Sequence, residues 1–407
     1  MTELAHKRSP KTAVAFLVIS AFISSAGFGL TAPVMPELIM TLTGGSTAQA
    51  ARWGGVAMFS YAIMQFVFSP IFGAFSDRFG RRPVLILSLV AFAVDMLALA
   101  LVTSLWAFLI VRALAGAFAA NFSTSNAYIA DITPKERRGQ RFALMGAAFG
   151  AGFIFGPAIG GILGDIDVRL PFLVGSAVAG INALFGYFLV AESLPKERRR
   201  PFSWSRANAV GTLTQLVRTA GVKPLLPVLF LATLSSWVYP TVWAYVAIER
   251  FDWSTEAIGY SVAYYGVIAF LSSALVAQFL LPRLQVATAI RIALLVEVVA
   301  LTGIGLATEG WMVYALITLA LISTMQDPAI RQELSALVPE DAQGELQGGL
   351  AALASIAMIL APLIYMALFT FTSGEQAIVY FPGAVFLAAA AISLLTLFLY
   401  ALAKVRE

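Results

Sequence analysis

Residues 52–103 consist of RWGGVAMFSYAIMQFVFSPIFGAF (52–75), SDRFGRR (76–82) and PVLILSLVAFAVDMLALALVT (83–103). The two outer runs are mostly apolar, and each is long enough to cross a bilayer, which takes about 20 residues in a helix. Neither run alternates polar and apolar residues, so each satisfies its backbone within a helix rather than in a barrel. The loop between them carries three arginines. This pattern predicts a membrane hairpin with a cytoplasmic turn.

The same pattern fills the chain, which is 60% hydrophobic and only 12% charged over 407 residues. A soluble domain of this length cannot bury so much apolar surface. The first run is too long for a signal peptide and lacks a small-residue cleavage site. We therefore predict an all-α membrane protein with twelve spans, at residues 12–37, 52–75, 83–103, 105–128, 141–164, 170–191, 224–248, 256–279, 287–307, 311–333, 345–371 and 377–403.

The distribution of positive charge predicts the topology. Of the 26 Lys and Arg residues, the predicted outer loops hold Arg52, Arg169 and Arg250, Arg112 lies within a span, and the other 22 lie on the cytoplasmic side. This bias predicts that both termini lie on the cytoplasmic side of a bacterial inner membrane. The cluster at 196–200 is then a topology signal, so neither its charge nor the net charge of +4 predicts nucleic-acid binding.

An internal repeat divides the chain. Residue pairs 205 positions apart recur on corresponding spans: Gly54 with Gly259, Arg78 with Arg283, Trp106 with Trp311, Pro134 with Pro339, Gly139 with Gly344 and Pro157 with Pro362. We predict two six-helix halves, residues 1–191 and 224–407, joined by a cytoplasmic connection at 192–223. Two parallel repeats are a transporter architecture, in which rocking gives alternating access to a central site.

Several motifs resemble the major facilitator superfamily. The segment from Gly73 to Pro83 is similar to its loop motif between spans two and three, and Arg112 with Gly116 resembles its fourth-helix motif. The fifth-helix pattern is similar to that of drug/proton antiporters, and the chain most resembles the tetracycline/proton antiporter family. The fifth-helix residues that carry the match are Gly146, Gly150, Gly152, Gly156, Pro157, Gly160 and Gly161.

This resemblance implies proton-driven efflux by a monomer of a small amphiphilic or aromatic compound. It implies a cytoplasmic gating latch, in which Asp77 acts at the start of span eleven and Arg81 meets Asp131. The basic residues are also explained by topology alone, and the glycines by ordinary close packing of helices. The predicted latch residues are Gly73, Asp77, Arg78, Gly80, Arg81, Arg82 and Asp131.

The resemblance has two exceptions that bear on substrate. The resembling family carries an acid at the position of Ser24 and a histidine at the position of Ala269. That family transports tetracyclines as magnesium chelates, so a metal ion is expected here only as part of a substrate. We predict no bound cofactor and no metal site of the protein's own.

Carboxylates are the expected proton carriers. The chain has no cysteine, and its one histidine, His6, lies outside the spans. Three acids lie deep within spans, where charge is costly and usually functional: Asp95, Glu297 and Asp327. Asp95 and Arg112 are equidistant from the turn at 103–104 and form either a coupling pair or a structural one. Asp327 is four residues from Arg331, with which it can pair.

Polar and aromatic residues inside the spans predict an amphipathic substrate path. These are Ser24, Gln65, Asn121, Ser125, Asn126, Trp237, Tyr239, Trp243, Tyr264, Gln326 and Gln347. Proton-coupled uptake of a small metabolite is the alternative, against which the fifth-helix glycines argue. An enzyme or receptor would need a catalytic cluster or a soluble domain, and the connection at 192–223 is too short for one, so we predict no enzymatic activity.

Overall fold

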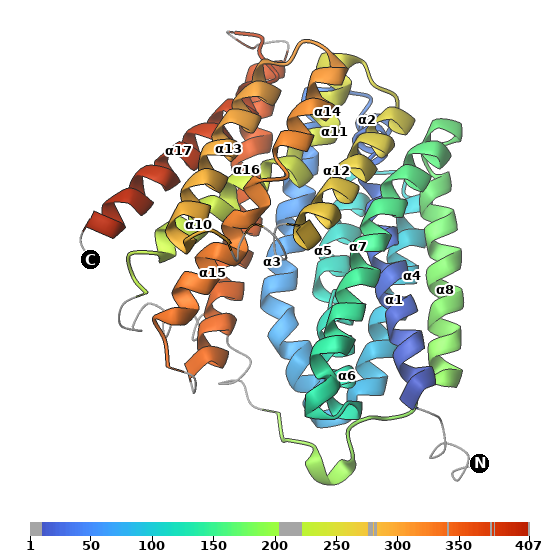
Figure 1. The fold of residues 1–407 in the computed structure, drawn as a ribbon. Coiled ribbons are helices and arrows are strands. Elements are labelled where there is room, and N and C mark those ends of the chain that lie inside the picture. The colour runs from blue at the N-terminus through green and yellow to red at the C-terminus, as the bar shows by residue number, and fades with distance from the viewer. Residues whose placement is uncertain are drawn as a thin grey trace. The chain divides into compact units, whose positions relative to one another are not determined.

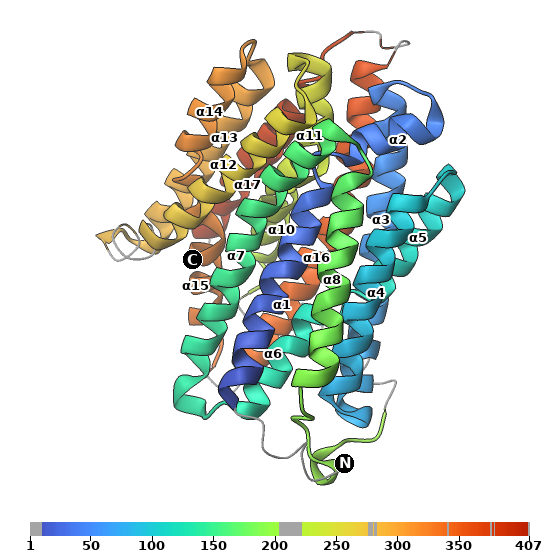
Figure 2. The same cartoon turned by 90° about the vertical axis from the view of Figure 1, so that its right-hand side faces the viewer.

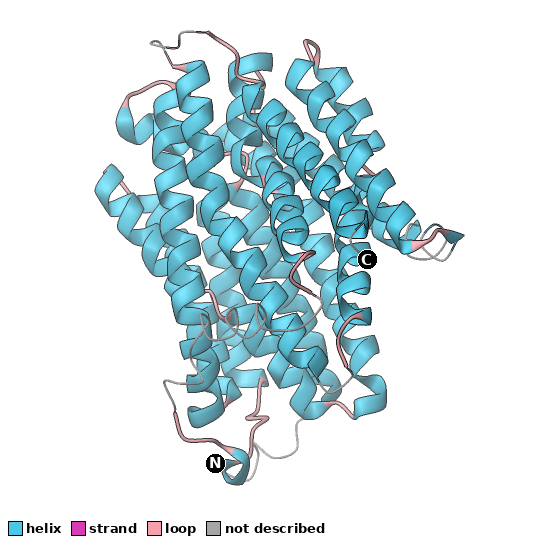
Figure 3. Ribbon diagram, turned by 90° about the vertical axis from the view of Figure 1, so that its left-hand side faces the viewer, coloured by secondary structure: helices cyan, strands magenta, loops and turns pink. Residues whose placement is uncertain are grey.

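The structure is a computed structural model that describes residues 10–202, 222–275, 280, 283–339, 342–374, 377 and 379–405 (Figure 1). Within these residues all regular elements are helices and none is a strand (Figure 3). The predicted all-α fold class is therefore confirmed. His6 and residues 203–221 of the predicted connection lie outside the described residues.

The chain forms two compact units, which are considered separately. Unit 1 comprises Met1–Thr43, Ser60–Asn208 and Ser254–Ala263, and unit 2 comprises Gly44–Phe59, Ala209–Trp253 and Tyr264–Glu407. Helices α3 (Thr47–Phe79) and α12 (Thr255–Leu275) contribute residues to both units. The boundary predicted at 192–223 stays a prediction, because most of that segment is not described.

The other helices follow one another along the membrane segments. Unit 1 contains α1 (Pro10–Thr31), α2 (Met35–Thr43), α4 (Arg81–Leu101), α5 (Leu105–Ala117), α6 (Asn121–Ile132), α7 (Lys135–Ile166), α8 (Leu170–Leu189) and η2 (Lys196–Arg198). Unit 2 contains α10 (Leu226–Ser236), α11 (Val238–Phe251), α13 (Val286–Leu306), α14 (Gly310–Leu319), η5 (Ser323–Met325), α15 (Gln326–Ala336), α16 (Gln343–Ser373) and α17 (Ala384–Val405).

Each of the twelve predicted ranges contains helix. In the described part of the chain, nine helices are long and apolar enough to cross a membrane, or ten if the bent pair of 310–319 and 323–336 is one span. A shorter apolar helix, Leu105–Ala117, occupies the fourth range together with α6. The chain is thus a multi-pass helical membrane protein.

Some predicted spans are not continuous helices. The first breaks after Thr31, where Pro33 and Pro36 remove backbone donors, and α2 then begins. The fourth breaks between α5 and α6, and the tenth bends by 40° between α14 and α15. Hydropathy did not indicate these breaks, because residues 118–120 and 320–322 are apolar. The twelfth helix begins at Ala384 rather than near 377, just after Pro382.

In unit 1, α1 packs between α7 and α8 (Figure 2). Gly152, Gly156 and Gly160 on α7 lie directly on the backbone of α1, at Phe22, Ala26 and Leu30 respectively. Small residues allow two backbones to approach closely, which is how helices associate where lipid provides no hydrophobic driving force. This contact holds α1 at a fixed height beside α7.

In unit 2, five helices meet in one apolar cluster. Leu229 of α10, Leu294 of α13, Ile330 of α15, Leu350 of α16 and Tyr400 of α17 are all at most 1% exposed and belong to it. Helices α13 and α17 lie alongside each other in this unit. The cluster sets the positions of α10, α13 and α15, which carry the polar site described below.

Candidate functional site

Asp95 of α4 and Arg112 of α5 form an ion pair within unit 1. Nη2 of Arg112 lies 2.5 Å from each carboxylate oxygen of Asp95. The arginine and aspartate side chains are 11% and 7% exposed. The Ser104 side chain caps α5 by accepting a hydrogen bond from the Ala107 N–H. This cap fixes the turn between α4 and α5, so that Asp95 and Arg112 lie at the same height along the two helices. The structure thus joins two residues predicted from spacing, while their role in proton coupling stays a prediction.

Tyr61 provides a third contact for this pair. The Arg112 guanidinium lies 5.8 Å from the centroid of the Tyr61 ring, within range of a cation–π interaction. Gly116, one helical turn beyond Arg112, lies against the Tyr61 backbone, so a side chain at this position would clash with that backbone. Gly116 therefore allows α5 to approach α3 closely enough for the contact.

A short hydrogen-bond chain joins predicted substrate residues in unit 1. Asn121, the first residue of α6, donates from Nδ2 to Oγ of Ser24 at 2.6 Å. Ser125 donates to Oδ1 of Asn121 at 3.4 Å. Gln65 and Asn126 are half-buried on α3 and α6. The break after α5 places the Asn121 amide at a helix start, where its side chain reaches across to α1.

Unit 2 contains a cavity of about 130 Å³ around Glu297. Glu297 is 3% exposed and accepts a hydrogen bond from Ser236 at 3.4 Å. Gln326 donates from Nε2 to the Ser236 hydroxyl at 3.0 Å. The residues lining the cavity are Ser236, Tyr239, Tyr265, Ile268, Ala269, Glu297, Ile317, Ala320, Ser323, Thr324, Gln326 and Asp327.

The same hydrogen-bond arrangement occurs at the Glu297 cavity and in the hydrogen-bond chain that contains Ser24. In each unit an amide at the first residue after a broken span donates to a serine: Asn121 to Ser24, and Gln326 to Ser236. Asn121 and Gln326 are 205 residues apart, which is the repeat offset. The repeat therefore extends from sequence spacing to side-chain contacts.

Four predicted substrate residues lie away from this cavity. Trp243 packs in an aromatic cluster, with its ring centroid 5.8 Å from that of Trp253. The Tyr264 hydroxyl is 2.6 Å from the hydroxyl of Thr318. Trp237 is half-buried at the junction of α10 and α11, and Gln347 is exposed on α16. These residues do not form one pocket with Tyr239 and Gln326 in unit 2.

Asp327 also pairs with Arg331, as their spacing predicts. Nε of Arg331 lies 2.8 Å from Oδ2 of Asp327, and the aspartate side chain is 54% exposed. A surface pair of this kind contributes at most about 1 kcal/mol. Asp327 therefore differs from Glu297, because its side chain is largely accessible and already has a cationic partner.

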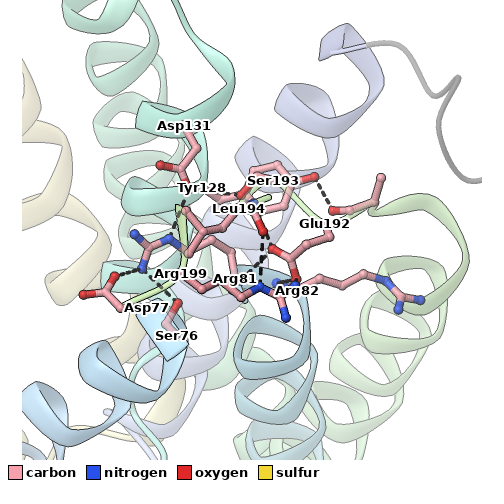
Figure 4. Close-up of polar contacts among 11 residues, drawn as sticks. Ser76, Asp77, Arg81, Arg82, Tyr128, Asp131, Glu192, Ser193, Leu194 and Arg199 are labelled. Carbon is pink, nitrogen blue, oxygen red and sulfur yellow. Dashed lines mark hydrogen bonds and ion pairs between the residues drawn. The ribbon is translucent and has the colours of Figure 1, made fainter. Parts of the chain in front are cut away.

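Arg81 is the centre of a charged network at the end of unit 1 where α3 and α4 meet (Figure 4). Its guanidinium lies 2.6 Å from Asp77 and 3.0 Å from Asp131, and it donates to Ser76. The predicted Arg81–Asp131 contact is confirmed. We call Ser76, Asp77, Arg81 and Asp131 the Arg81 network.

Glu192, which the sequence motifs did not indicate, completes the start of α4. Its carboxylate accepts from the backbone N–H of Arg81 at 2.8 Å and of Arg82 at 3.4 Å. An acid at this position satisfies free amide groups and the positive end of the helix dipole. Gly80 precedes α4 with φ of 108°, a conformation that only glycine adopts readily.

The other residues of this loop have separate roles. Arg82 donates to the carbonyl groups of Tyr187 and Val190, both at 2.7 Å, and so caps the end of α8. The guanidinium of Arg78 lies 5.1 Å from the centroid of the Phe79 ring. A side chain at Gly73 would meet no atom within 4 Å. Of the predicted latch residues, the structure therefore brings together Asp77, Arg81 and Asp131.

The fifth-span glycines do not all make the same kind of contact. A Cβ at Gly146 or Gly150 would meet no atom within 4 Å. Gly152, Gly156 and Gly160 face α1, whereas Gly161 faces the start of α12 near Thr255 and Gly259. Pro157 lies against Gly29 of α1. Gly150 and Gly152 are two residues apart and Gly160 and Gly161 are adjacent, and each helical residue turns the direction by about 100°, so these glycines fall on different faces.

Some contacts around Glu297 were not predicted. Ser236 ends α10, and sequence periodicity cannot orient a residue beside a break. Tyr265 lines the cavity while its neighbour Tyr264 does not, because consecutive helical residues point about 100° apart. Only helical register, and not residue type, distinguishes these two tyrosines.

Curated relatives resemble the chain along most of its length. The tetracycline resistance protein, class C, of Escherichia coli is 37% identical over 85% of this chain and 87% of the relative. The class D tetracycline resistance protein of Salmonella ordonez is 34% identical over 89% of this chain and 90% of the relative. Multidrug resistance protein 2 of Bacillus subtilis is 29% identical over 87% of this chain and 88% of the relative.

Solved structures share the fold at lower identity. A bacterial homologue of the human lysosomal transporter Spinster, inward-facing and unoccupied, matches with a TM-score of 0.77 and 15% identity, over 97% of each chain. The human organic anion transporter MFSD10 (TETRAN) matches with a TM-score of 0.67 and 22% identity, over 97% of this chain and 100% of the other. The family model of the Major Facilitator Superfamily matches residues 17–362. The chain belongs to the Major Facilitator Superfamily.

Proposed function

We propose that this protein is a proton-coupled antiporter that exports small amphiphilic or aromatic compounds from the cytoplasm. The observation that carries the proposal is Glu297, a carboxylate that is 3% exposed within a span and lines a cavity with aromatic and amide groups. Such a group exchanges its proton only with what enters the cavity, so binding and protonation are linked. The transporter needs no bound cofactor, because the proton gradient drives it.

The relatives support export rather than uptake. Proteins 31–37% identical to this chain are named tetracycline resistance proteins, and one at 29% is named a multidrug resistance protein. A membrane transporter gives resistance to a drug by moving the drug outward. The positive-inside bias supports an inner-membrane protein with both termini on the cytoplasmic side. Asp95 with Arg112 and Glu297 with its cavity are the proposed coupling sites of the two units.

Glu297→Gln tests proton coupling. We expect the variant to reach the membrane at wild-type amount and to lose at least about 90% of substrate uptake into everted vesicles driven by an imposed pH gradient, because an amide cannot release a proton. Substrate counterflow without a gradient should continue. The control is Ser235→Ala on α10, whose hydroxyl contacts Ala389 and Ser393 instead of the cavity. Wild-type gradient-driven uptake in Glu297→Gln would remove this acid from the mechanism.

Asp77→Asn tests the Arg81 network. Losing the charge weakens the contact with Arg81 at the end of α3, far along the helix from the substrate residues. We expect transport to fall at least about fivefold while substrate affinity changes less than about twofold. The control is Glu197→Gln, an exposed acid of η2. An affinity loss that accounts for the whole transport defect would contradict a gating role for Asp77.

A panel of antibiotics and dyes tests substrate range. Ser24 and Ala269 stand where the resembling family has an acid and a histidine, and Ala269 lines the Glu297 cavity. With two fewer titratable groups, we expect expression in a pump-deficient host to raise tolerance to several unrelated amphiphiles, with tetracycline not dominant. Strong resistance to tetracycline alone, dependent on magnesium, would show that the specificity of the resembling family is retained.

A further inference from the structure

The Glu297 cavity has room for a head group rather than a whole drug. Its volume is about 130 Å³. A drug-sized ligand normally fills a pocket of about 300–1,000 Å³. The cavity therefore fits one small polar group of a larger molecule, and its side chains indicate which group.

Two polar atoms at the cavity are buried without a partner. Gln326 is 6% exposed, and its Oε1 has no hydrogen-bond partner. The Ser236 hydroxyl has one proton, which it directs to the Ala232 carbonyl at 3.1 Å or to Glu297 at 3.4 Å, so in either case its oxygen accepts from the Gln326 Nε2 and leaves Oε1 on the other side of the amide. The Tyr239 hydroxyl oxygen is likewise buried and unpartnered. A buried acceptor without a donor is unfavourable by about 1–3 kcal/mol, so a donor entering the cavity would be bound.

The cavity is lined by acidic residues and by no basic residue. Glu297 and Asp327 line it, whereas no Lys, Arg or His is among its lining residues. Arg331 lies nearby but is held by Asp327 at 2.8 Å. The stacked rings of Tyr239 and Tyr265, with centroids 5.4 Å apart, both line the cavity and offer electron-rich faces. Carboxylate, amide oxygen and aromatic rings together favour a cation that also donates hydrogen bonds.

We propose that this cavity binds the protonated amine of an exported amphiphile, with Glu297 and the Gln326 Oε1 as acceptors and Tyr239 and Tyr265 as the aromatic wall. The proposal rests on the proposed function and narrows its substrate class to aromatic compounds with an ammonium group. Ser236 is a positioning residue that orients the Gln326 amide. Most of a drug-sized substrate lies outside the cavity, since about 130 Å³ is less than the volume of the pockets that such ligands fill.

A matched pair of probes tests the proposal. Monodansylcadaverine carries a fluorescent aromatic group and a terminal ammonium, and its N-acetyl derivative has the same body without the charge. Binding of each to the purified protein in nanodiscs at pH 8 is measured by dansyl fluorescence anisotropy. We expect the ammonium probe to bind at least about tenfold more tightly, since a hydrogen bond to a charged group contributes about 1.5–3 kcal/mol.

Variants locate this preference. Gln326→Leu and Glu297→Gln should each reduce the affinity ratio of the two probes at least about fivefold. Gln326→Glu preserves size and adds a negative charge, so it should increase the ratio and gives a gain of binding that misfolding cannot mimic. Ser235→Ala should leave the ratio unchanged.

The outcomes separate this proposal from the general one. Equal affinities of the two probes for the wild-type protein, or a ratio that none of the three variants changes, would overturn the ammonium site. Proton-driven uptake of the acetylated probe into everted vesicles, as fast as that of the amine, would also overturn the ammonium site while supporting proton-coupled efflux. If the imposed pH gradient changed the vesicle uptake of none of the compounds tested, the proposed function itself would be rejected.

Discussion

Arg112→Leu is expected to abolish transport and to destabilise the protein by about 3–5 kcal/mol, because removal of one partner leaves the other charge of a buried pair uncompensated. The Asp95 carboxylate is 7% exposed and receives both of its short contacts from Arg112. No other basic side chain of the described residues contacts it in the structure. Thermal stability in detergent, followed by size-exclusion chromatography, measures the loss.

The double variant Asp95→Leu/Arg112→Leu separates a structural pair from a coupling pair. Replacing a buried pair by apolar residues is often neutral for stability, so the double variant should recover most of the lost stability. If Asp95 takes part in proton coupling, transport will remain absent. Recovery of transport along with stability would make the pair purely structural. Arg331→Leu is the stability control, since its partner Asp327 is 54% exposed and the pair contributes little.

Gly156→Val is expected to give the second large effect, the loss of the α1–α7 contact. Even the first carbon of a side chain at Gly156 would overlap the carbonyl oxygen of Ala26 on α1. Inserting carbons into a packed interface is unfavourable by about 1–3 kcal/mol, and contact with backbone leaves no flexible side chain to move aside. We expect reduced thermal stability and little gradient-driven transport, measured in detergent and in vesicles respectively.

Gly150→Val provides a comparison on the same helix. Gly150 and Gly156 belong to the same sequence motif, but a Cβ at Gly150 would meet no atom within 4 Å. The free energy of unfolding of Gly150→Val should therefore stay within about 1 kcal/mol of wild type, since the helix propensities of glycine and valine differ by less than that. Equal destabilisation by the two substitutions would contradict the two-faced packing of α7 in unit 1.

The repeat and the charged residues were predictable from the sequence for physical reasons. Unpaired backbone groups are unfavourable in lipid, so long apolar runs have to be helices. Because this constraint applies to every span, hydropathy alone predicted the fold class. Pairs such as Asp95 with Arg112 and Asp327 with Arg331 were predictable because helical rise and hairpin turns fix their separation. These are short-range relations along one or two helices.

The sequence by itself thus determined the helical membrane class, the superfamily motifs and two of the three predicted deep acids, Asp95 and Glu297. Tertiary structure alone decided which glycines carry a contact, which of Tyr264 and Tyr265 faces the cavity, and that Glu192 caps α4. It also decided the breaks that direct Asn121 to Ser24 and Gln326 to Ser236. The physical reason is that side-chain direction changes by about 100° with each helical residue, so a small shift in register or a break, which hydropathy does not record, selects the residues that face a site.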